Sequence, residues 1–234
     1  MRFGVVVFPG SNCERDTLHV LREVLHEPAV PVWHEDTDLA NFDCIVLPGG
    51  FAHGDYLRAG AIARFSPVMA AVEQFAAAGG LVWGICNGFQ VLVEAGLLPG
   101  AMLQNAGLRF VCRWVDVRVE RDDLPFTRGL APGTVLHLPV AHHEGCYYAD
   151  AATLDELDRN GQIVLRYCDS KGVTVAAANP NGSIANVAGV CNRARNVFGL
   201  MPHPERCAEP LLGGADGLQL FEAVAQAAVS LAGR

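Results

Sequence analysis

The first hundred residues alternate between short apolar runs and helical patterns, and this alternation constrains the fold most. Residues 3–8 read FGVVVF, which is apolar throughout, as expected of a strand buried on both faces. Further short strands are expected at Val30–Trp33, Cys44–Leu47 and Leu81–Ile85. Helical patterns separate these runs. Strands that alternate with helices predict an α/β fold with an open, mostly parallel, doubly wound sheet flanked by helices.

The helices within the first hundred residues are predicted from local signals. Ser11 and Glu14 have the spacing of a capping box, which predicts a helix that continues to about His26. Two more helices are expected at Pro67–Ala78, an amphipathic stretch, and at Phe89–Ala95, which directly follows the fourth strand.

After residue 99 the pattern changes to strands with no long helix between them. Valines at 115, 117 and 119 alternate with charged residues, which is typical of a half-exposed strand. Further strands are expected at Val135–Val140, Ile163–Tyr167 and Ile184–Val190. This section therefore predicts an antiparallel excursion from the main sheet in the middle of the chain.

The end of the chain returns to the first pattern. A last strand is expected at Val197–Met201, followed by a closing helix. One face of that helix carries Leu218, Phe221, Val224, Ala225, Ala228 and Leu231. No internal repeat or linker interrupts the sequence, so residues 1–234 are expected to form a single domain.

Composition excludes several classes of protein. The formal net charge of −8 gives no basic footprint for nucleic acid and no polybasic anchor for a membrane. The longest weakly charged stretch is broken by glycines, a proline and polar side chains, so no membrane span is expected. The eight cysteines form no CxxC pair, and the start does not resemble a signal peptide. We therefore expect reduced thiols in a cytoplasmic protein.

One cysteine has the setting of a nucleophile. Cys86 lies between Gly84 and Gly88, where a predicted parallel strand ends and a helix begins. The helix N-terminus stabilises a thiolate, and the two glycines leave room for the sharp turn of a nucleophile elbow. The alternative is a buried cysteine in a tight turn. Cys13 also follows a strand and opens a helix, but no paired glycines flank it.

A thiolate nucleophile needs a base and a group that orients the base. His203 follows the last predicted strand, and Glu205 stands two residues further on, within reach of the imidazole N–H. The backbone N–H groups of Gly50 and Asn87 are candidates for an oxyanion hole. The alternatives are a surface turn for the histidine segment and an ordinary glycine turn for Gly50.

Together these segments resemble the class I glutamine amidotransferases, whose motifs follow the same order. The matching motifs are PGG at 48–50, GICNGFQ at 84–90 and HPE at 203–205. Two further blocks, PGSNC at 9–13 and GFxxGDYLRxGAIARFSP at 50–67, are similar to the glutaminase subunits of phosphoribosylformylglycinamidine synthases in purine biosynthesis. The resemblance covers nearly the whole chain.

The resemblance implies a reaction and roles for particular residues. The chain is expected to hydrolyse glutamine to glutamate and ammonia, with Cys86 as nucleophile, His203 as acid and base, and Glu205 as the residue that orients His203. Gly49, Phe51 and Gln90 are expected to line the glutamine pocket.

The resemblance also implies partners. The ammonia is expected to pass to a large synthetase subunit that carries ATP and Mg and converts formylglycinamide ribonucleotide to formylglycinamidine ribonucleotide. A small third subunit completes the complex in bacteria with a short synthetase chain. No cofactor and no metal are expected in this chain itself. A separate hypothesis, the weaker form of a non-catalytic scaffold, is that the isolated chain is nearly inactive because its oxyanion hole forms only in the complex.

Two segments depart from the expected pattern. Residues 141–146 read AHHEGC where AHGEG is expected, which raises the question of a zinc site. Adjacent residues on a strand point to opposite faces, so a loop near the glutamine pocket or the synthetase interface is the better interpretation. Residues 169–178 are interpreted as a lengthened hairpin without an assigned function.

Two rival functions of different classes compete with the glutaminase, one catalytic and one not. An intracellular cysteine hydrolase acting on peptides or small amides would also need the elbow and a histidine. A non-catalytic scaffold subunit would need neither, and both Cys86 and His203 are present.

Overall fold

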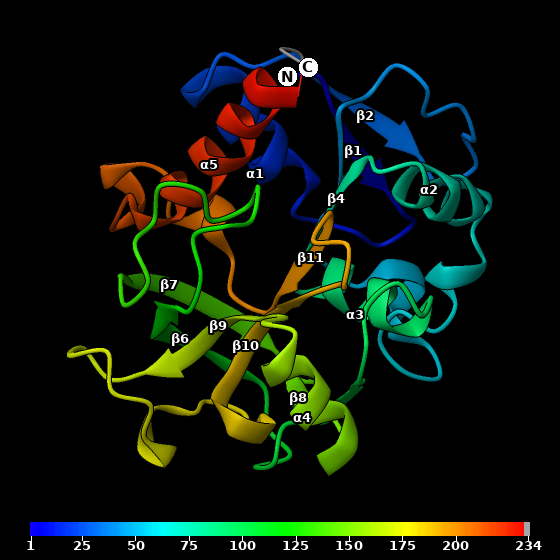
Figure 1. The fold of residues 1–234 in the computed structure, drawn as a ribbon. Coiled ribbons are helices and arrows are strands. Elements are labelled where there is room, and N and C mark those ends of the chain that lie inside the picture. The colour runs from blue at the N-terminus through cyan, green and yellow to red at the C-terminus, as the bar shows by residue number, and fades with distance from the viewer. Residues whose placement is uncertain (232–234) are drawn as a thin grey trace.

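The computed structural model describes residues 1–231 and centres on one nine-stranded sheet (Figure 1). The strands are β1 (Phe3–Val7), β2 (Ala29–Trp33), β3 (Cys44–Leu47), β4 (Leu81–Ile85), β5 (Ala101–Leu103), β6 (Val111–Val119), β7 (Val135–His142), β8 (Cys146–Tyr148), β9 (Ile163–Cys168), β10 (Val187–Cys191) and β11 (Val197–Leu200). The helices are α1 (Glu14–His19), α2 (Pro67–Ala77), α3 (Asn87–Glu94), α4 (Ala151–Arg159) and α5 (Asp216–Leu231).

The strand order of the large sheet is β2-β1-β3-β4-β11-β10-β9-β6-β7. The first five strands in this order run parallel, and the remaining four add to the sheet in antiparallel fashion. Strands β5 and β8 form a separate antiparallel pair. The predicted doubly wound sheet with a central antiparallel excursion is therefore confirmed.

Helices cover both faces of the parallel strands, as doubly wound folds require. Figure 1 shows α1 and α5 on one side of these strands and α2 and α3 on the other. Every residue of β3 and β4 is buried, which explains their continuous apolar sequence. Trp83 of β4 packs edge-to-face against Phe221 of α5, with ring centroids 4.7 Å apart. The predicted apolar face of α5 includes Ala228 and Leu231, whose side chains are not among those that the structure describes.

One local prediction is wrong, and two others need adjustment. Ser11 does not cap α1, because its hydroxyl donates to the Phe8 carbonyl and accepts from the Phe8 N–H; the N-cap position is Cys13. The predicted helix to about His26 is present as α1, continued by a π-helical turn at Val20–Val24. The middle section is expected to have no long helix; it contains the nine-residue α4, which Asp150 caps through a 2.7 Å bond from the Thr153 N–H.

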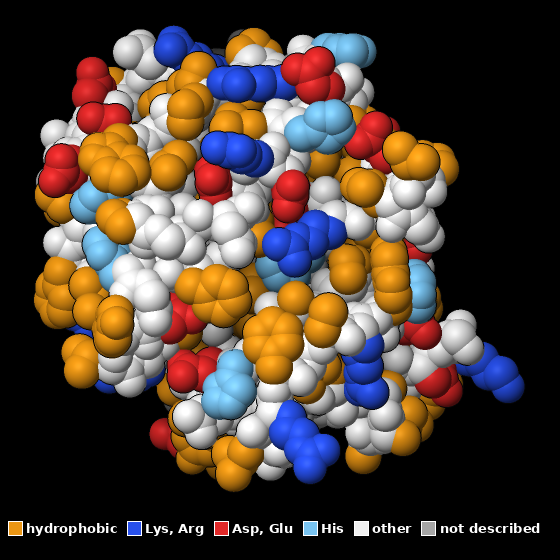
Figure 2. Space-filling model, turned by 180° about the vertical axis from the view of Figure 1, so that it is seen from behind, with side chains coloured by type: hydrophobic (Ala, Val, Ile, Leu, Met, Phe, Trp, Pro, Cys, Tyr) orange, Lys and Arg blue, Asp and Glu red, His pale blue; other side chains and the backbone are white. Residues whose placement is uncertain are grey.

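Two other segments are as expected or nearly so. Residues 169–178 lie in the long connection between β9 and β10, which pair antiparallel, so the lengthened hairpin is present. The predicted strand at 184–190 begins only at Val187, after a 3₁₀ turn. Within residues 1–231, no helix combines the length and the apolar character that a bilayer crossing requires. On the face shown in Figure 2, basic, acidic and hydrophobic side chains are interspersed.

Candidate active site

Cys86 alone makes the turn from β4 into α3. Its backbone angles, φ 49° and ψ −104°, lie outside the ordinary regions for a residue with a side chain. Its N–H still donates to the Leu200 carbonyl of β11 at 2.8 Å, as a strand residue would. Its carbonyl already accepts from the Gln90 N–H at 3.1 Å, as a helix residue would. Such strain at a strand-to-helix junction is typical of a nucleophile elbow.

The glycines around Cys86 allow the backbones to approach closely. A Cβ atom on Gly88 would lie 1.9 Å from the carbonyl oxygen of Leu47 in β3. A Cβ atom on Gly84 would lie 2.7 Å from the carbonyl carbon of Gly88. Helix α3 can therefore start against the sheet only because both positions are glycine, which is the reason the sequence suggests.

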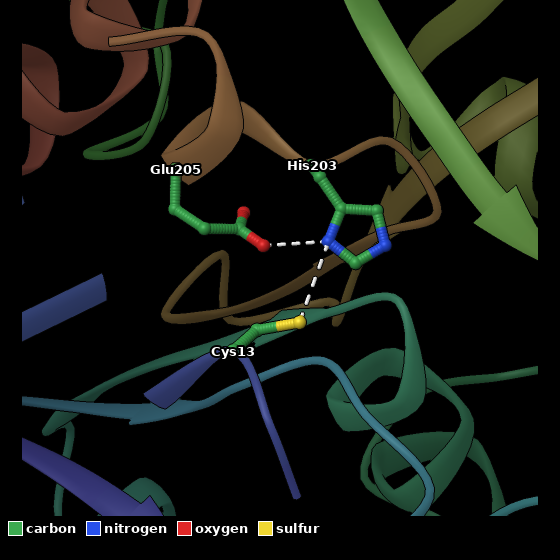
Figure 3. A group of neighbouring side chains, drawn as sticks. All are labelled: Cys13, His203 and Glu205. Atoms are coloured by element: carbon green, nitrogen blue, oxygen red, sulfur yellow. Dashed lines mark hydrogen bonds and ion pairs between the residues drawn. The ribbon is translucent and has the colours of Figure 1, made fainter. Parts of the chain in front are cut away.

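His203 and Glu205 form a buried pair beyond the end of β11 (Figure 3). The His203 Nδ1 atom lies 2.5 Å from Glu205 Oε1, and the two residues are 2% and 1% exposed. The other ring nitrogen, Nε2, is buried and has no hydrogen-bond partner among the described residues. A carboxylate that accepts from Nδ1–H leaves Nε2 as the basic atom of the ring, ready to exchange a proton with a reacting group.

The charges around His203 favour its protonated form. Burial lowers the pKa of this imidazole, but the Glu205 carboxylate and the Cys86 sulfur raise it, and the net direction is well above the ordinary value. Cys86 is among the groups that raise the pKa of His203, while its thiol donates to the Ala141 carbonyl at 3.9 Å. The fold therefore brings these two side chains, 117 positions apart in the sequence, into one site.

A second sulfur also lies beside His203. Cys13 Sγ is 4.0 Å from Nδ1, and Figure 3 shows it approaching the same ring nitrogen as Glu205. Arg206 Nη2 donates to this sulfur at 2.9 Å, and burial raises the pKa of the Cys13 thiol. Cys13 has an ordinary negative φ and lies outside the cavity beside Cys86. Its position and conformation are those of a packed residue rather than an elbow nucleophile.

Ligand atoms of Cys13, His203 and Glu205 lie within 4.8 Å of one another, so this group has the spacing of a metal site. Two contacts oppose a cation there. The guanidinium of Arg206 already contacts the sulfur, and Nδ1 of His203 is already bonded to the carboxylate. A metal ion would have to displace both interactions.

A cavity of about 140 Å³ adjoins the nucleophile. Its lining residues are Gly50, Phe51, Asp55, Cys86, Gln90, Ala141, His142, His143 and Glu144. The N–H groups of Gly50 and Asn87 make no backbone hydrogen bond within residues 1–231, so both are available to a ligand. Gly49 is not part of the lining: a Cβ atom there would lie 2.7 Å from Cε1 of His203, so this glycine makes room for the histidine ring.

The side chain of Asn87 organises one wall of the cavity. Its oxygen accepts from the Ala52 N–H at 2.9 Å, and its nitrogen donates to Asp55 Oδ1 at 3.0 Å and Gln90 Oε1 at 2.9 Å. The Gln90 nitrogen in turn donates to the Glu144 carbonyl. The sequence predictions name the backbone of Asn87 and the side chain of Gln90 but miss this network. The only signal for Asp55 is its place in the GDYLR block.

Residues 141–144, in the segment that departs from the expected AHGEG pattern, also line the cavity. His142 bonds Asn105 Oδ1 at 3.1 Å and lies 3.4 Å from Asn181 Nδ2. Burial, with a contribution from the charge of His203, lowers the pKa of His142 to about 3. A neutral, hydrogen-bonded histidine of this kind is part of the wall, and the interpretation of the segment as a loop near the pocket agrees with its position.

A doubly wound sheet that carries an elbow thiol next to a buried histidine–glutamate pair defines the class of triad amidotransferases. Residues 1–213 match the family model of the CobB/CobQ-like glutamine amidotransferase domain. The chain belongs to this family and, within it, to the PurQ subunits of phosphoribosylformylglycinamidine synthases.

Individual relatives match over nearly their whole length. The PurQ subunit of Gloeobacter violaceus is 58% identical over 231 residues, which cover 99% of this chain and 100% of the relative. The PurQ subunit of Moorella thermoacetica is 57% identical over 224 residues, covering 96% of this chain and 95% of the relative. In the solved structure of PurLQS from Thermotoga maritima, one chain superposes with a TM-score of 0.84 at 43% identity, covering 96% of this chain and 97% of that one.

Proposed function

We propose that this chain is the glutaminase subunit of a phosphoribosylformylglycinamidine synthase and that Cys86, His203 and Glu205 are its catalytic triad. The observation that carries the proposal is the strained elbow of Cys86 beside the buried His203–Glu205 pair. The names of the relatives supply the enzyme complex.

In the first half of the reaction, the Cys86 thiolate attacks the carboxamide carbon of glutamine. The carbonyl oxygen becomes an oxyanion, for which the N–H groups of Gly50 and Asn87 are the proposed donors. His203, protonated at Nε2, gives its proton to the departing nitrogen. The C–N bond breaks, ammonia leaves, and a glutamyl thioester remains on the sulfur.

In the second half, the same histidine acts as a base. Nε2, now neutral, takes a proton from water, whose oxygen attacks the thioester carbonyl. The C–S bond breaks, glutamate leaves, and the thiolate–imidazolium pair is restored. Glu205 accepts the Nδ1–H bond throughout, so the ring keeps one tautomer and one orientation.

The remaining predicted residues receive distinct roles. Phe51 and Gln90 line the cavity and are proposed to contact glutamine. Gly49 was expected to do the same; we propose instead that it serves the site indirectly, by leaving room for the ring of His203.

Several properties of the chain and its complex follow from the family. We propose that residues 1–234 form a single glutamine amidotransferase domain that needs no metal or cofactor of its own. ATP and Mg are expected on the synthetase subunit, which uses the ammonia to convert formylglycinamide ribonucleotide to formylglycinamidine ribonucleotide. A small third subunit is expected in the complex, and the cytoplasm is the proposed location. The PurLQS assembly of Thermotoga maritima supports these partners by its name.

The experiment compares nitrogen sources in the reconstituted complex. Cys86→Ala should abolish synthesis with glutamine while synthesis with added ammonia continues, because only the glutaminase step needs the thiol. Cys112→Ala, which removes an exposed thiol, is the matched control and should retain both activities. Glutamine-dependent synthesis by Cys86→Ala at the wild-type rate would contradict the proposal.

A further inference from the structure

The cavity beside Cys86 has an unbalanced charge. Asp55 and Glu144 line it together with His142 and His143, and no lysine or arginine of residues 1–231 does. His142 does not compensate, because burial lowers its pKa to about 3 and keeps the ring neutral near pH 7. A partly enclosed cavity that has two carboxylates and neither lysine nor arginine among its described lining residues favours a ligand that carries a positive charge.

Each of the two carboxylates has one bonded oxygen. Glu144 Oε2 accepts from the Ala59 N–H at 2.9 Å, which fixes that side chain to the neighbouring loop, and Glu144 Oε1 has no hydrogen-bond partner among the described residues. Asp55 Oδ1 accepts from Asn87 Nδ2 at 3.0 Å, but Asp55 Oδ2 has no hydrogen-bond partner in the described part of the chain. Burial raises the pKa of Asp55 to about 6; the Asn87 bond opposes this shift and Glu144 adds to it. The charge of Glu144 also acts on the Arg58 guanidinium and raises its pKa, whereas no basic group contributes to the pKa of Asp55. Asp55 is therefore the carboxylate without a nearby cation among the described residues.

A strained turn holds Asp55 in place. Three consecutive residues have left-handed φ angles: His53 at 53°, Gly54 at 70° and Asp55 at 51°. Left-handed backbone is costly for residues with side chains and persists where surrounding contacts enforce it. Here the contacts come from Asn87, which bonds both Ala52 and Asp55. Because Asn87 directly follows Cys86, the carboxylate is fixed relative to the nucleophile.

We propose that Asp55 is a specificity-determining residue that binds the α-ammonium group of L-glutamine. This inference rests on the proposed function, since it takes the cavity as the glutamine site. The α-ammonium is the only cationic group of glutamine. When the carboxamide carbon lies at Cys86, this group is the one available to bind a carboxylate of the cavity. An N–H bond from that ammonium to Oδ2 is charge-assisted, and it supplies the cation that the cavity lacks.

The test compares two amides in the reconstituted complex. Glutaramate is glutamine without the α-amino group, so it reports on everything except this contact. Asp55→Asn removes the charge and keeps an oxygen that can accept from Asn87. We expect its kcat/KM for L-glutamine to fall roughly 30- to 1000-fold, mainly through KM, because one partner of a partly buried charge pair is lost. The kcat/KM for glutaramate should stay within about threefold of the wild type.

Glu144→Gln is the matched variant, since it removes the other carboxylate and keeps an acceptor for the Ala59 N–H. It should retain the wild-type preference for glutamine over glutaramate. If Glu144→Gln loses that preference and Asp55→Asn keeps it, the ammonium binds Glu144 and the proposal is overturned. An equal loss on both amides in Asp55→Asn would show a structural role and would also overturn it.

Binding measurements separate recognition from turnover. In Cys86→Ala complexes, calorimetric titration should show L-glutamine binding more tightly than glutaramate, and Asp55→Asn should remove that difference. If L-glutamine and glutaramate bind equally tightly while Asp55 is present, only the assignment of Asp55 as the residue that binds the α-ammonium is overturned. Absence of glutamine hydrolysis by the wild-type complex would instead refute the proposed function.

Discussion

Replacing Gly88 by alanine tests whether the close approach of α3 to β3 positions the active site. The added Cβ atom would lie 1.9 Å from the Leu47 carbonyl oxygen, whereas real Cβ contacts are essentially never shorter than 3.0 Å. Helix and strand must therefore separate by about 1 Å. Because Cys86 and the Asn87 N–H begin this helix, the nucleophile and one proposed oxyanion donor move with it.

Two magnitudes follow from that displacement. A shift of about 1 Å in a catalytic group costs roughly 100-fold, so kcat/KM for glutamine in the complex should fall by about that factor. Overpacking typically costs about 1–3 kcal/mol, which lowers Tm by about 2–12 °C for a chain of this size. The better helix propensity of alanine offsets at most about 1 kcal/mol of this cost.

The assay measures glutamine-dependent and ammonia-dependent synthesis side by side, with Tm from calorimetry. Gly107→Ala is the control, because a Cβ atom there meets nothing within 4 Å and no left-handed φ is involved. It should match the wild type in both activities. Full glutamine-dependent activity in Gly88→Ala would refute the argument that this contact positions the thiol.

Three further predictions concern separate parts of the molecule. Cys13→Ser should reduce glutamine turnover by less than about tenfold, whereas His203→Ala should cost several orders of magnitude, because Cys13 lies on the Nδ1 side of the ring; steady-state kinetics of the complex compares them. His142→Gln should flatten the pH dependence of stability. Burial lowers the pKa of His142 to about 3 in the folded protein. Because only the unfolded state takes up this proton below pH 6.5, the free energy of unfolding of the wild type should fall by about 2 kcal/mol between pH 6.5 and 5 through this group. Chemical denaturation at both pH values checks the difference. Asp150→Ala should lower Tm by about 2–4 °C, since it removes the N-cap bond of α4, and should leave glutamine turnover unchanged.

The parallel half of the fold could be predicted because its signals are local. Each strand from β1 to β4 is a continuous apolar run, and glycines mark where the chain turns. Helix α4 was missed because Leu154 and Leu157 are its only large apolar residues, so it lacks a strong apolar period. The misleading capping box has a physical reason too: the Ser11 hydroxyl is already used within its own turn by Phe8.

The candidate site also has residues that could be predicted from local signals and residues that could not. Cys86, His203 and Glu205 could be found from short motifs, because an elbow and a histidine–carboxylate pair each need only adjacent residues. The network of Asp55, Asn87 and Glu144 could not, because it depends on contacts between segments 32 to 85 positions apart. No sequence period relates these segments, and only the fold brings them to one cavity.

The central claim is that Cys86 is the thiol that His203 serves. The most direct measurement is rapid acid quenching of the complex during glutamine turnover, followed by peptide mass spectrometry. We expect a glutamyl thioester on the peptide that contains Cys86. A glutamyl group on Cys13, or ammonia release from glutamine with no adduct on Cys86 at any quench time, would contradict the account.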